Sequence, residues 1–570
     1  MDTPNNWDLI QSWVDSCTPS NRSHEACYEF RTLANSDIPS RLIDLEAKGV
    51  HQGMRLSLSP KERAPLPYAT LSYTWGPNTA QDQLPLLRKN TLQLFSKKIP
   101  FKTLPRLFQD VINMARKLKF RYLWIDALCI IQDDERDWQS ESAVMGQIYE
   151  NSTLNIAAGG AAGSHSPLFS KRDPTLVQPC KVKLNWPKDY VDESFYVFGA
   201  DFLRAHILQT PLNRRGWVVQ ERLLSHRVLH IGKHQLFWRC DHHMACETFP
   251  KEIPNAHRYT VFTTSTDLEK SQYLKYLKIG AWFDVVEAYS KCDLTKESDR
   301  LIAMSGIART FGDRMEILQS SNDAVYFAGL WRSKLIESML WQVTDGKRAD
   351  RSPCERSPTY GSVGYVAPSW SWASVRGKVI YKPREEVGKR SDLDCNTYTN
   401  LVDILETYTL PTNSQNPYGQ LQECHIKLRG MVISSDDFTW TRYTPDQEAG
   451  SVRNYNAIFA FKGLLRDPVI CVIDDMNDFK PRKTFLSKVG FPSSPGFEFL
   501  PLIWRLDQDN NQYKIEERLK LGIPNLEGIL VTRNNGEDNE YRRVGYFRSL
   551  PVAKHLKAFV DQKRSDILLV

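Results

Sequence analysis

The stretch from Arg121 to Asp134, RYLWIDALCIIQDD, constrains the fold more than any other part of the chain. Its apolar residues run almost without a break from Leu123 to Ile131, which is too short to span a membrane and too continuous for a half-exposed strand. The pattern is typical of a central strand buried on both faces of a parallel sheet. One charge, Asp126, interrupts the run. We expect it near a site, because groups past the carboxyl end of such a strand face the ligand crevice.

The segments on either side alternate between strand and helix patterns. Residues 68–76 (YATLSYTWG) predict a strand that ends in a Gly-Pro turn, and residues 104–119 have the 3.6-residue apolar period of a helix. After the central run, Asp137 is expected to cap a second helix, and residues 152–158 (STLNIAA) predict a further strand. This order of strands and helices predicts an α/β fold with a parallel sheet and helices on both of its faces.

Other patterns place hairpins around this core. Residues 41–59 contain two short alternating stretches, and residues 227–240 predict a hairpin that turns at Gly232-Lys233. Between these parts, residues 161–213 interrupt the strand and helix order and are interpreted as an insertion with two extended segments.

The length of 570 residues and the 41% hydrophobic composition predict more than one domain. We expect four parts: an N-terminal leader (1–40), the α/β domain (41–250), a helical region (260–350) and a β-rich C-terminal region (365–570).

Charge and composition exclude several classes of protein. The net charge of +7 is spread without a dense basic block, so no nucleic-acid partner is expected. The first residues lack the basic and apolar regions of a signal peptide, and no apolar stretch reaches the length of a membrane span. Eleven scattered cysteines then indicate reduced, buried thiols. Together these features predict a soluble cytoplasmic protein.

Two motifs resemble ligand sites only loosely. The four potential zinc ligands Cys240, His242, His243 and Cys246 are tightly spaced, and a structural finger would bring a second, separated pair. Packing of a hairpin is therefore favoured, and no metal is expected. Residues 159–164 (GGAAGS) lack both GxGxxG and a following Lys-Ser/Thr pair, so a plain turn is favoured over a phosphate loop.

Four stretches taken together resemble the fungal heterokaryon-incompatibility (HET) domain. They are residues 68–76, 104–138, 145–158 and 214–229. The resemblance implies a fungal protein linked to non-self recognition and regulated cell death, with an unknown incompatibility partner protein.

HET domains are in turn distantly similar to the TIR fold, a doubly wound, flavodoxin-like sheet. Some TIR domains cleave NAD at the nicotinamide bond through one glutamate in a Trp-Cys-x-x-Glu motif. Trp217 and Glu221 have that spacing, with Val218 in place of the cysteine, and Ser72-Tyr73 would match the end of the first TIR strand. The resemblance implies that Glu221 is the catalytic carboxylate and that NAD is a substrate.

The residues that would contact NAD on this interpretation are Ser72, Tyr73, Trp75, Asp126 and Trp217. Structural alternatives stay open for each type of residue. Glu221 could pair with an arginine, Arg214, Arg215 or Arg222, and hold its helix. The strand-end residues could pack a core, and Asp126 could anchor an arginine or cap a loop instead of binding a ribose hydroxyl.

Two classes of function follow. The protein is either an enzyme that consumes NAD or a non-catalytic signalling module that acts through a homo-oligomer of its HET domain or through a partner. The position of Glu221 discriminates between them, because a catalytic carboxylate would share a site with Ser72, Tyr73 and Asp126, whereas a structural one would form an ion pair.

Overall fold

The structure is a computed structural model, in which the chain forms two compact units. The first unit consists of Met1–Tyr276, Cys292–Leu294 and Ala303–Thr310, and the second of Leu277–Lys291, Thr295–Ile302 and Phe311–Val570. The described residues are 2–18, 21, 24, 27, 39–46, 53–58, 67–76, 84–183, 194–197, 203–253, 279–318, 324–343, 355–356, 364–381, 398–434, 438–441, 456–461, 468–473, 498–505, 525–534, 539–549 and 564–570.

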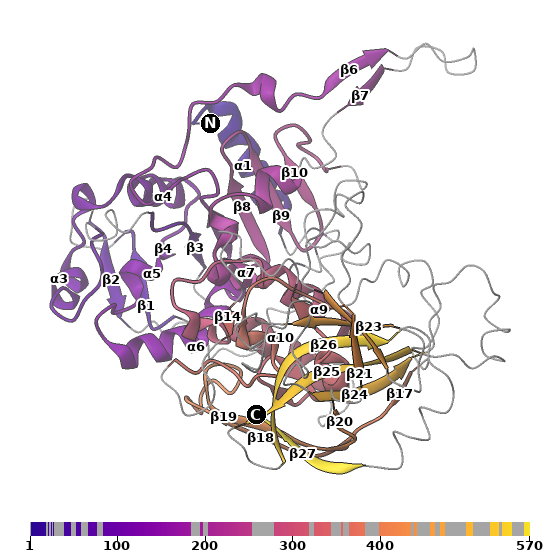
Figure 1. The fold of residues 1–570 in the computed structure, drawn as a ribbon. Coiled ribbons are helices and arrows are strands. Elements are labelled where there is room, and N and C mark those ends of the chain that lie inside the picture. Colours follow the sequence, from indigo (N-terminus) through magenta and orange to yellow (C-terminus); the bar gives the residue numbers. More distant parts are fainter. Residues whose placement is uncertain are drawn as a thin grey trace, which may run out of the picture. The chain divides into compact units, whose positions relative to one another are not determined.

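An eight-stranded sheet forms the centre of the first unit (Figure 1). Its strands, in spatial order, are β10 (Met244–Cys246), β9 (Leu236–Cys240), β8 (Arg227–Ile231), β5 (Leu154–Ala157), β3 (Tyr68–Ser72), β4 (Tyr122–Trp124), β1 (Arg41–Asp44) and β2 (Arg55–Leu58).

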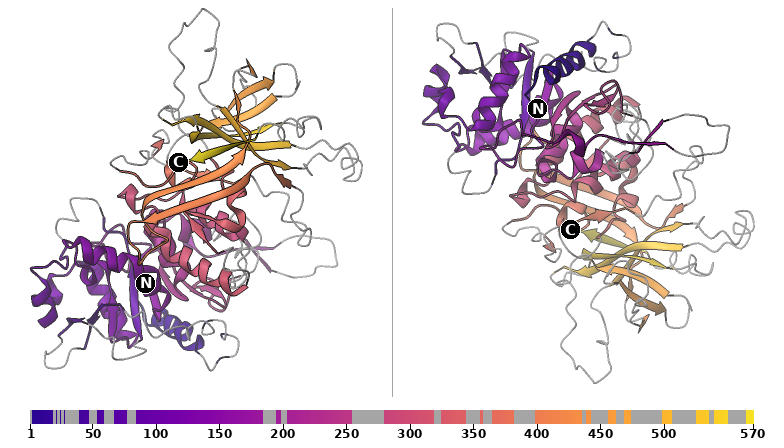
Figure 2. Two further views of the ribbon diagram at one scale, coloured as in Figure 1. Left: turned by 90° about the horizontal axis from the view of Figure 1, so that it is seen from below. Right: turned by 90° about the horizontal axis from the view of Figure 1, so that it is seen from above.

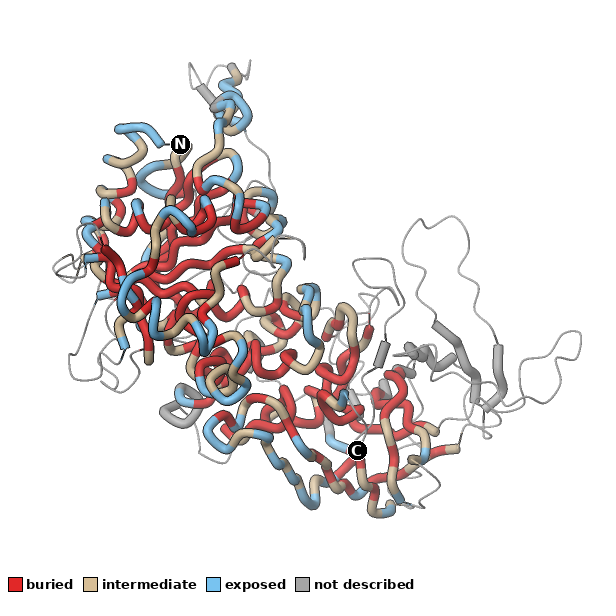
Figure 3. Tube along the Cα trace, turned by 90° about the vertical axis from the view of Figure 1, so that its left-hand side faces the viewer, coloured by how far each residue is buried: buried red, intermediate tan, exposed pale blue. Residues whose placement is uncertain are grey.

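The four inner strands are parallel and the outer strands are antiparallel. Numbered along the chain, the parallel strands lie in the order 2-1-3-4, as in flavodoxin-like sheets. Every residue of these four strands is buried (Figure 3). The predicted α/β class and both predicted hairpins of this unit are confirmed. The β8–β9 turn is centred on Lys233-His234, one residue later than predicted, because Gly232 still bonds across the hairpin to Gln235 (3.1 Å).

Three helices connect the parallel strands. They are α4 (Arg106–Lys117), α6 (Glu135–Glu150) and α7 (Gly216–Leu224). Right-handed crossovers place α4 on one face of the sheet and α6 and α7 on the other, because the chain moves in opposite directions along the sheet after β3 and after β4. Contacts between α6 and α7 agree with this arrangement.

The central run is not one continuous strand, contrary to the sequence prediction. Strand β4 ends at Trp124, and residues Asp126–Cys129 form a short helix, α5. The Cys129 amide bonds the Ile125 carbonyl oxygen (2.8 Å), and the Asp126 carboxylate accepts from the Ala127 amide (2.6 Å). Because β4 and α5 are both buried on all sides, their sequences are equally apolar, and the periodicity of apolar residues could not show where the strand ends and the helix begins. Asp126 consequently lies just past the carboxyl end of β4.

The cap of α6 also differs from the prediction. Asp134, not Asp137, is the N-cap, and its carboxylate accepts from the Arg136 amide (3.1 Å). Asp137 lies in the first turn and forms a partly buried ion pair with Arg41 of β1 (2.7 Å). A residue one turn further along the helix is better placed to reach the neighbouring strand than to cap its own helix.

The remaining elements of the first unit lie at its periphery. They are α1 (Pro4–Ser16), α3 (Leu92–Lys97) and a hairpin of β6 (Cys180–Lys183) and β7 (Ser194–Val197) in the predicted insertion. The ring of Trp13 in α1 stacks on Trp238 of β9 at 6.4 Å, and its indole donates to the Pro250 carbonyl oxygen (2.8 Å).

The second unit begins with helices α9 (Ile279–Tyr289) and α10 (Ile302–Leu318), the latter shared with the first unit. Residues 324–343, predicted as helix, instead contain a hairpin of Tyr326–Phe327 (β11) and Leu330–Trp331 (β12). Ala328 and Gly329 both have positive φ (47° and 95°), as a two-residue hairpin turn requires. A further predicted helix at 267–278 lies outside the described residues.

The predicted β-rich C-terminal region is confirmed as an eleven-stranded, mostly antiparallel sheet (Figure 2). Its strands are β17 (Tyr398–Asn400), β18 (Asp403–Pro411), β19 (Leu421–Gly430), β20 (Ile433–Ser434), β21 (Phe438–Thr441), β22 (Asn456–Phe461), β23 (Pro468–Ile473), β24 (Glu498–Arg505), β25 (Asn525–Arg533), β26 (Glu540–Ser549) and β27 (Ser565–Leu569). Across the described part of the chain, no helix is both long and apolar enough to cross a membrane.

The glycine-rich turn after β5 packs backbone against backbone. The Gly160 amide donates to the Ile231 carbonyl oxygen (2.8 Å), and a Cβ atom on Gly160 would lie 2.8 Å from the Gly232 carbonyl carbon. A Cβ atom on Gly159 would lie 3.6 Å from the nearest atom, in the Thr210 side chain. The turn therefore joins β5 to the β8–β9 hairpin, as expected for a plain turn.

This contrast predicts different costs for two adjacent substitutions. Gly160→Ala should destabilise the first unit by about 1–3 kcal/mol, because the added methyl group overlaps a backbone that cannot move aside. Gly159→Ala is the matched control and should change the stability by less than about 1 kcal/mol. Urea unfolding of both variants measures the difference, and equal losses would contradict the close packing at Gly160.

Candidate functional site

The end of β3 divides its side chains between the two faces of the sheet. The ring of Tyr73 packs edge-on against Phe108 of α4 at a centroid distance of 5.1 Å. The Ser72 hydroxyl lies on the opposite face, 3.2 Å from the side-chain oxygen of Asn155 in β5. Two adjacent residues that the sequence proposed for one ligand therefore face different helices.

Glu221 lies on the Ser72 face and is only 5% exposed. Its main-chain oxygen accepts from the Ser225 hydroxyl (2.6 Å) and, more distantly, from the Asn155 amide (3.5 Å), which fixes this part of α7 against β5. Its carboxylate lies beside the hydroxyls of Ser72 and Tyr149. The carboxylate oxygen Oε2 is buried and has no hydrogen-bond partner among the described residues.

The electrostatic environment of Glu221 is unusual for a carboxylate. Burial raises its pKa to about 7, although a hydrogen bond from Ser72 and the charge of Arg215 each lower it; nearby Asp126 raises it further. Among the described residues, no arginine or lysine forms an ion pair with this carboxylate. The structural alternative, in which Glu221 forms an ion pair with Arg214, Arg215 or Arg222, is therefore not observed.

Asp126 approaches the same region from the end of β4. Its Oδ2 accepts from the Trp75 indole (3.0 Å), and its Oδ1 accepts from the Ala127 amide. The pKa of the Tyr73 phenol is raised by burial and by the neighbouring Asp126. Asp126 is half-buried, so it is the more accessible of the two carboxylates. In this position Asp126 orients the Trp75 indole, and the Asp126 carboxylate lies near Glu221.

Trp217 has a different neighbourhood. Its half-buried indole packs edge-on against Trp138 of α6, with the ring centroids 6.3 Å apart.

The sequence did not predict Tyr149 and Asn155 in this region, and it indicated Arg215 only as a possible ion-pair partner of Glu221. Arg215 donates to the main-chain oxygen of Tyr73 and so connects the start of α7 to the end of β3. Tyr149 of α6 donates to the main-chain oxygen of Leu71 (3.1 Å), and Asn155 bonds Ser72. The signal for Asn155 was present, since a polar residue inside the buried strand STLNIAA must find a partner there.

The four potential zinc ligands of residues 240–246, for which the sequence favoured hairpin packing, do not form one group. Cys240 belongs to the main core of the unit, whereas Cys246 packs with Phe237 and Met244 in a separate cluster. Cys240 instead lies close to Cys17, His24 and Cys27.

The arrangement at Glu221 suits proton transfer near neutral pH. A carboxyl group with a pKa of about 7 can donate or accept a proton under cellular conditions. It lies by β3 and β5, the first and third parallel strands, where the strand order reverses and ligands of flavodoxin-like sheets bind. A second carboxylate, Asp126, adds negative charge, so the region favours a positively charged group of a ligand.

Comparisons with known proteins agree with the fold. Residues 68–221 match the family model described as heterokaryon incompatibility protein (HET), from the start of β3 to Glu221 itself. No curated protein and no solved structure gives a significant match.

The buried carboxyl group predicts a pH-dependent stability. Near pH 4 the Glu221 carboxyl is largely protonated in both states. As the pH rises to 7 the unfolded chain ionises first, so the folded state loses up to about 3 kcal/mol relative to it. Glu221→Gln removes this loss and should stabilise the first unit at pH 8 but not near pH 4. Thermal unfolding at both pH values measures the effect.

Glu141→Gln is the matched control, because Glu141 is equally buried but lies 3.4 Å from its ion-pair partner Arg41. Glu141→Gln should lower the stability at pH 8, since the positive charge of Arg41 then loses one of the negative charges that compensate it. A loss of stability at pH 8 in Glu221→Gln as well would show that the Glu221 carboxylate is structural.

Proposed function

We propose that this heterokaryon-incompatibility (HET) domain protein acts in fungal non-self recognition and triggers regulated cell death by hydrolysing NAD. The observation that carries the proposal is the position of Glu221. Its carboxyl group is buried, forms no ion pair with any residue that the structure describes, and has a pKa of about 7. It lies beside Ser72 and near Asp126 at the reversal of strand order. The choice of NAD as the substrate, and of the nicotinamide bond as the bond that is cleaved, comes from the distant TIR resemblance and the spacing of Trp217 and Glu221.

The reaction breaks the bond between ribose C1′ and the nicotinamide nitrogen. The bonding electrons leave with nicotinamide, which becomes neutral, and an oxocarbenium-like centre develops on the ribose. The ionised Glu221 carboxylate stabilises this centre and then takes a proton from the water that adds to C1′. The products are nicotinamide, ADP-ribose and one proton, so atoms and charge balance without a metal or a redox partner.

The other residues have supporting roles in this proposal. Asp126 binds a ribose hydroxyl and is oriented by the Trp75 indole. Ser72 holds the Glu221 carboxylate, and the half-buried rings of Trp75 and Trp217 offer surfaces for stacking on a base. Tyr73 is 2% exposed, so in this proposal its buried phenol lies next to Asp126 and does not contact the nucleotide.

Activation is the second part of the proposal. Clustering of HET domains into a homo-oligomer, or binding of an incompatibility partner protein in the cytoplasm, switches the activity on. Experiments in cells should therefore include a version of the chain that can be clustered by an added dimerising ligand.

The test follows cellular NAD and viability after induced expression in a fungal host. The wild-type chain should drain NAD before the cells die, whereas Glu221→Gln should lower the rate of NAD loss by at least about 100-fold and keep the cells alive. Glu135→Gln is the matched control, because Glu135 is an exposed residue of α6 in the same domain and should behave as wild type.

Death with NAD intact, with or without forced clustering, would contradict hydrolysis and favour a non-catalytic signalling module. Loss of activity in Glu221→Gln counts as catalytic only if the variant keeps or gains thermal stability at pH 8. A variant that is inactive because it unfolds would instead show a structural role.

A further inference from the structure

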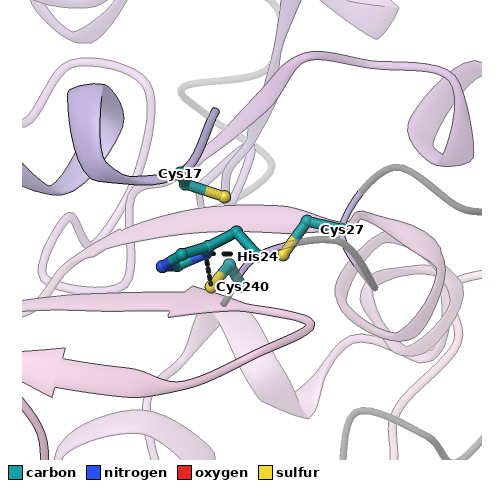
Figure 4. A group of neighbouring side chains, drawn as sticks. All are labelled: Cys17, His24, Cys27 and Cys240. Atoms are coloured by element: carbon teal, nitrogen blue, oxygen red, sulfur yellow. Dashed lines mark hydrogen bonds between the residues drawn. The ribbon is translucent and has the colours of Figure 1, made fainter. Parts of the chain in front are cut away.

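Four soft metal-binding side chains from distant parts of the sequence meet in the first unit (Figure 4). Cys17 follows α1, His24 and Cys27 come shortly after it, and Cys240 is the last residue of β9. All four are buried, and their donor atoms lie within 4.8 Å of one another. Residues 240–246 alone lack a second, separated set of zinc ligands, and in the folded chain Cys17, His24 and Cys27 provide three such ligands beside Cys240.

The distances agree with a tetrahedral zinc site. The Nδ1 atom of His24 lies 3.6 Å from the Cys240 sulfur and 3.7 Å from the Cys27 sulfur. Zinc binds sulfur at about 2.3 Å and imidazole nitrogen at about 2.0 Å, so the nitrogen and sulfur ligands of a tetrahedron lie about 3.5 Å apart. Cys17, Cys27 and Cys240 form no disulfide in this structure, so a disulfide does not account for their proximity.

The charge around the group also suits a bound metal ion. Three thiolates and one Zn²⁺ leave one negative charge, which is costly to bury without a partner. Arg227 of β8 is 4% exposed, and its Nε donates to the Cys17 sulfur (3.0 Å). A buried guanidinium in contact with one ligand sulfur offsets this charge and holds the sulfur in place.

The loop after β9 supports the same group from outside. The Cys240 amide donates to the main-chain oxygen of His243 (3.0 Å), and the Nδ1 atom of His243 lies 3.6 Å from the Cys240 sulfur. The rings of His242 and His243 pack on His24 with centroids 4.9 and 5.2 Å apart. These contacts fix the orientation of the His24 ring toward the sulfurs.

We propose that Cys17, His24, Cys27 and Cys240 bind one Zn²⁺ ion in a closed structural site. Four protein ligands leave no open position for water or substrate, which distinguishes a structural zinc site from a catalytic one. The mixture of thiolates and one imidazole selects zinc over the harder Mg²⁺ and Ca²⁺ ions. The metal fastens the segment after α1 to β9, next to the stacked pair Trp13 and Trp238. The proposal does not depend on NAD hydrolysis.

The first test is the metal content of the full chain, purified under reducing conditions after expression with added zinc. Elemental analysis should find about one zinc ion per chain. Cys27→Ser and Cys240→Ser should each lower the zinc affinity by at least about 100-fold. Cys246→Ser is the matched control, since Cys246 is a buried cysteine of the adjoining strand but lies outside the group, and it should retain the zinc.

A second measurement avoids variants that fail to fold. The wild-type chain is stripped of metal and titrated with Co²⁺, which should give the thiolate charge-transfer band and the intense visible bands of a tetrahedral cobalt site, both abolished by added Zn²⁺. Three results would each overturn the proposal: a folded wild-type chain that binds neither ion stoichiometrically, zinc retained in both ligand variants, or a disulfide among the three cysteines in the freshly purified chain.

Discussion

The burial of the four parallel strands on both faces is the constraint from which the candidate site follows. Every residue of these strands is buried, so a polar side chain in them is stabilised by a partner inside the protein. Ser72 and Asn155 meet each other across adjacent strands for this reason, and Asn155 also reaches the α7 backbone at Glu221. The polar contacts that satisfy the sheet thus bring the carboxylate of Glu221 to the carboxyl end of β3.

Glu221 differs from the other buried carboxylates of the same unit, because those carboxylates form ion pairs with arginines. Asp44 is paired with Arg121 at 3.0 Å, and Glu141 lies 3.4 Å from Arg41. The half-buried Asp137 and Glu247 are also paired, with Arg41 at 2.7 Å and with Arg172. Within the described part of the chain, Glu221 has no ion-pair partner; the hydroxyls of Ser72 and Tyr149 lie beside it, and the charges of Arg215 and Asp126 act on it from a greater distance. A buried carboxylate without a cation lowers stability at neutral pH, and such a cost is typical of residues kept for chemistry.

The antiparallel strands extend the sheet and provide the surface on which the N-terminal segment lies. Trp238 of β9 receives Trp13, and the end of the same strand places Cys240 among Cys17, His24 and Cys27. One antiparallel strand, β9, therefore provides both an aromatic contact and a ligand of the proposed zinc site. The apolar contact and the metal would stabilise the same junction by independent means, burial of indole surface and metal–thiolate bonding.

The sequence by itself determined the elements whose signal is local: the period of α4, the buried strand β5, and the hairpins β1–β2 and β8–β9. Tertiary structure decided the features that depend on contacts through space. Uniform burial hid the end of β4, so the place of Asp126 could not be read from hydropathy. Whether Glu221 meets an arginine depends on the packing of α7 against β3 and β5. Of the proposed zinc ligands, Cys240 is more than two hundred residues from the other three, and only the folded sheet brings it to His24, because periodicity and spacing carry no information over such a distance.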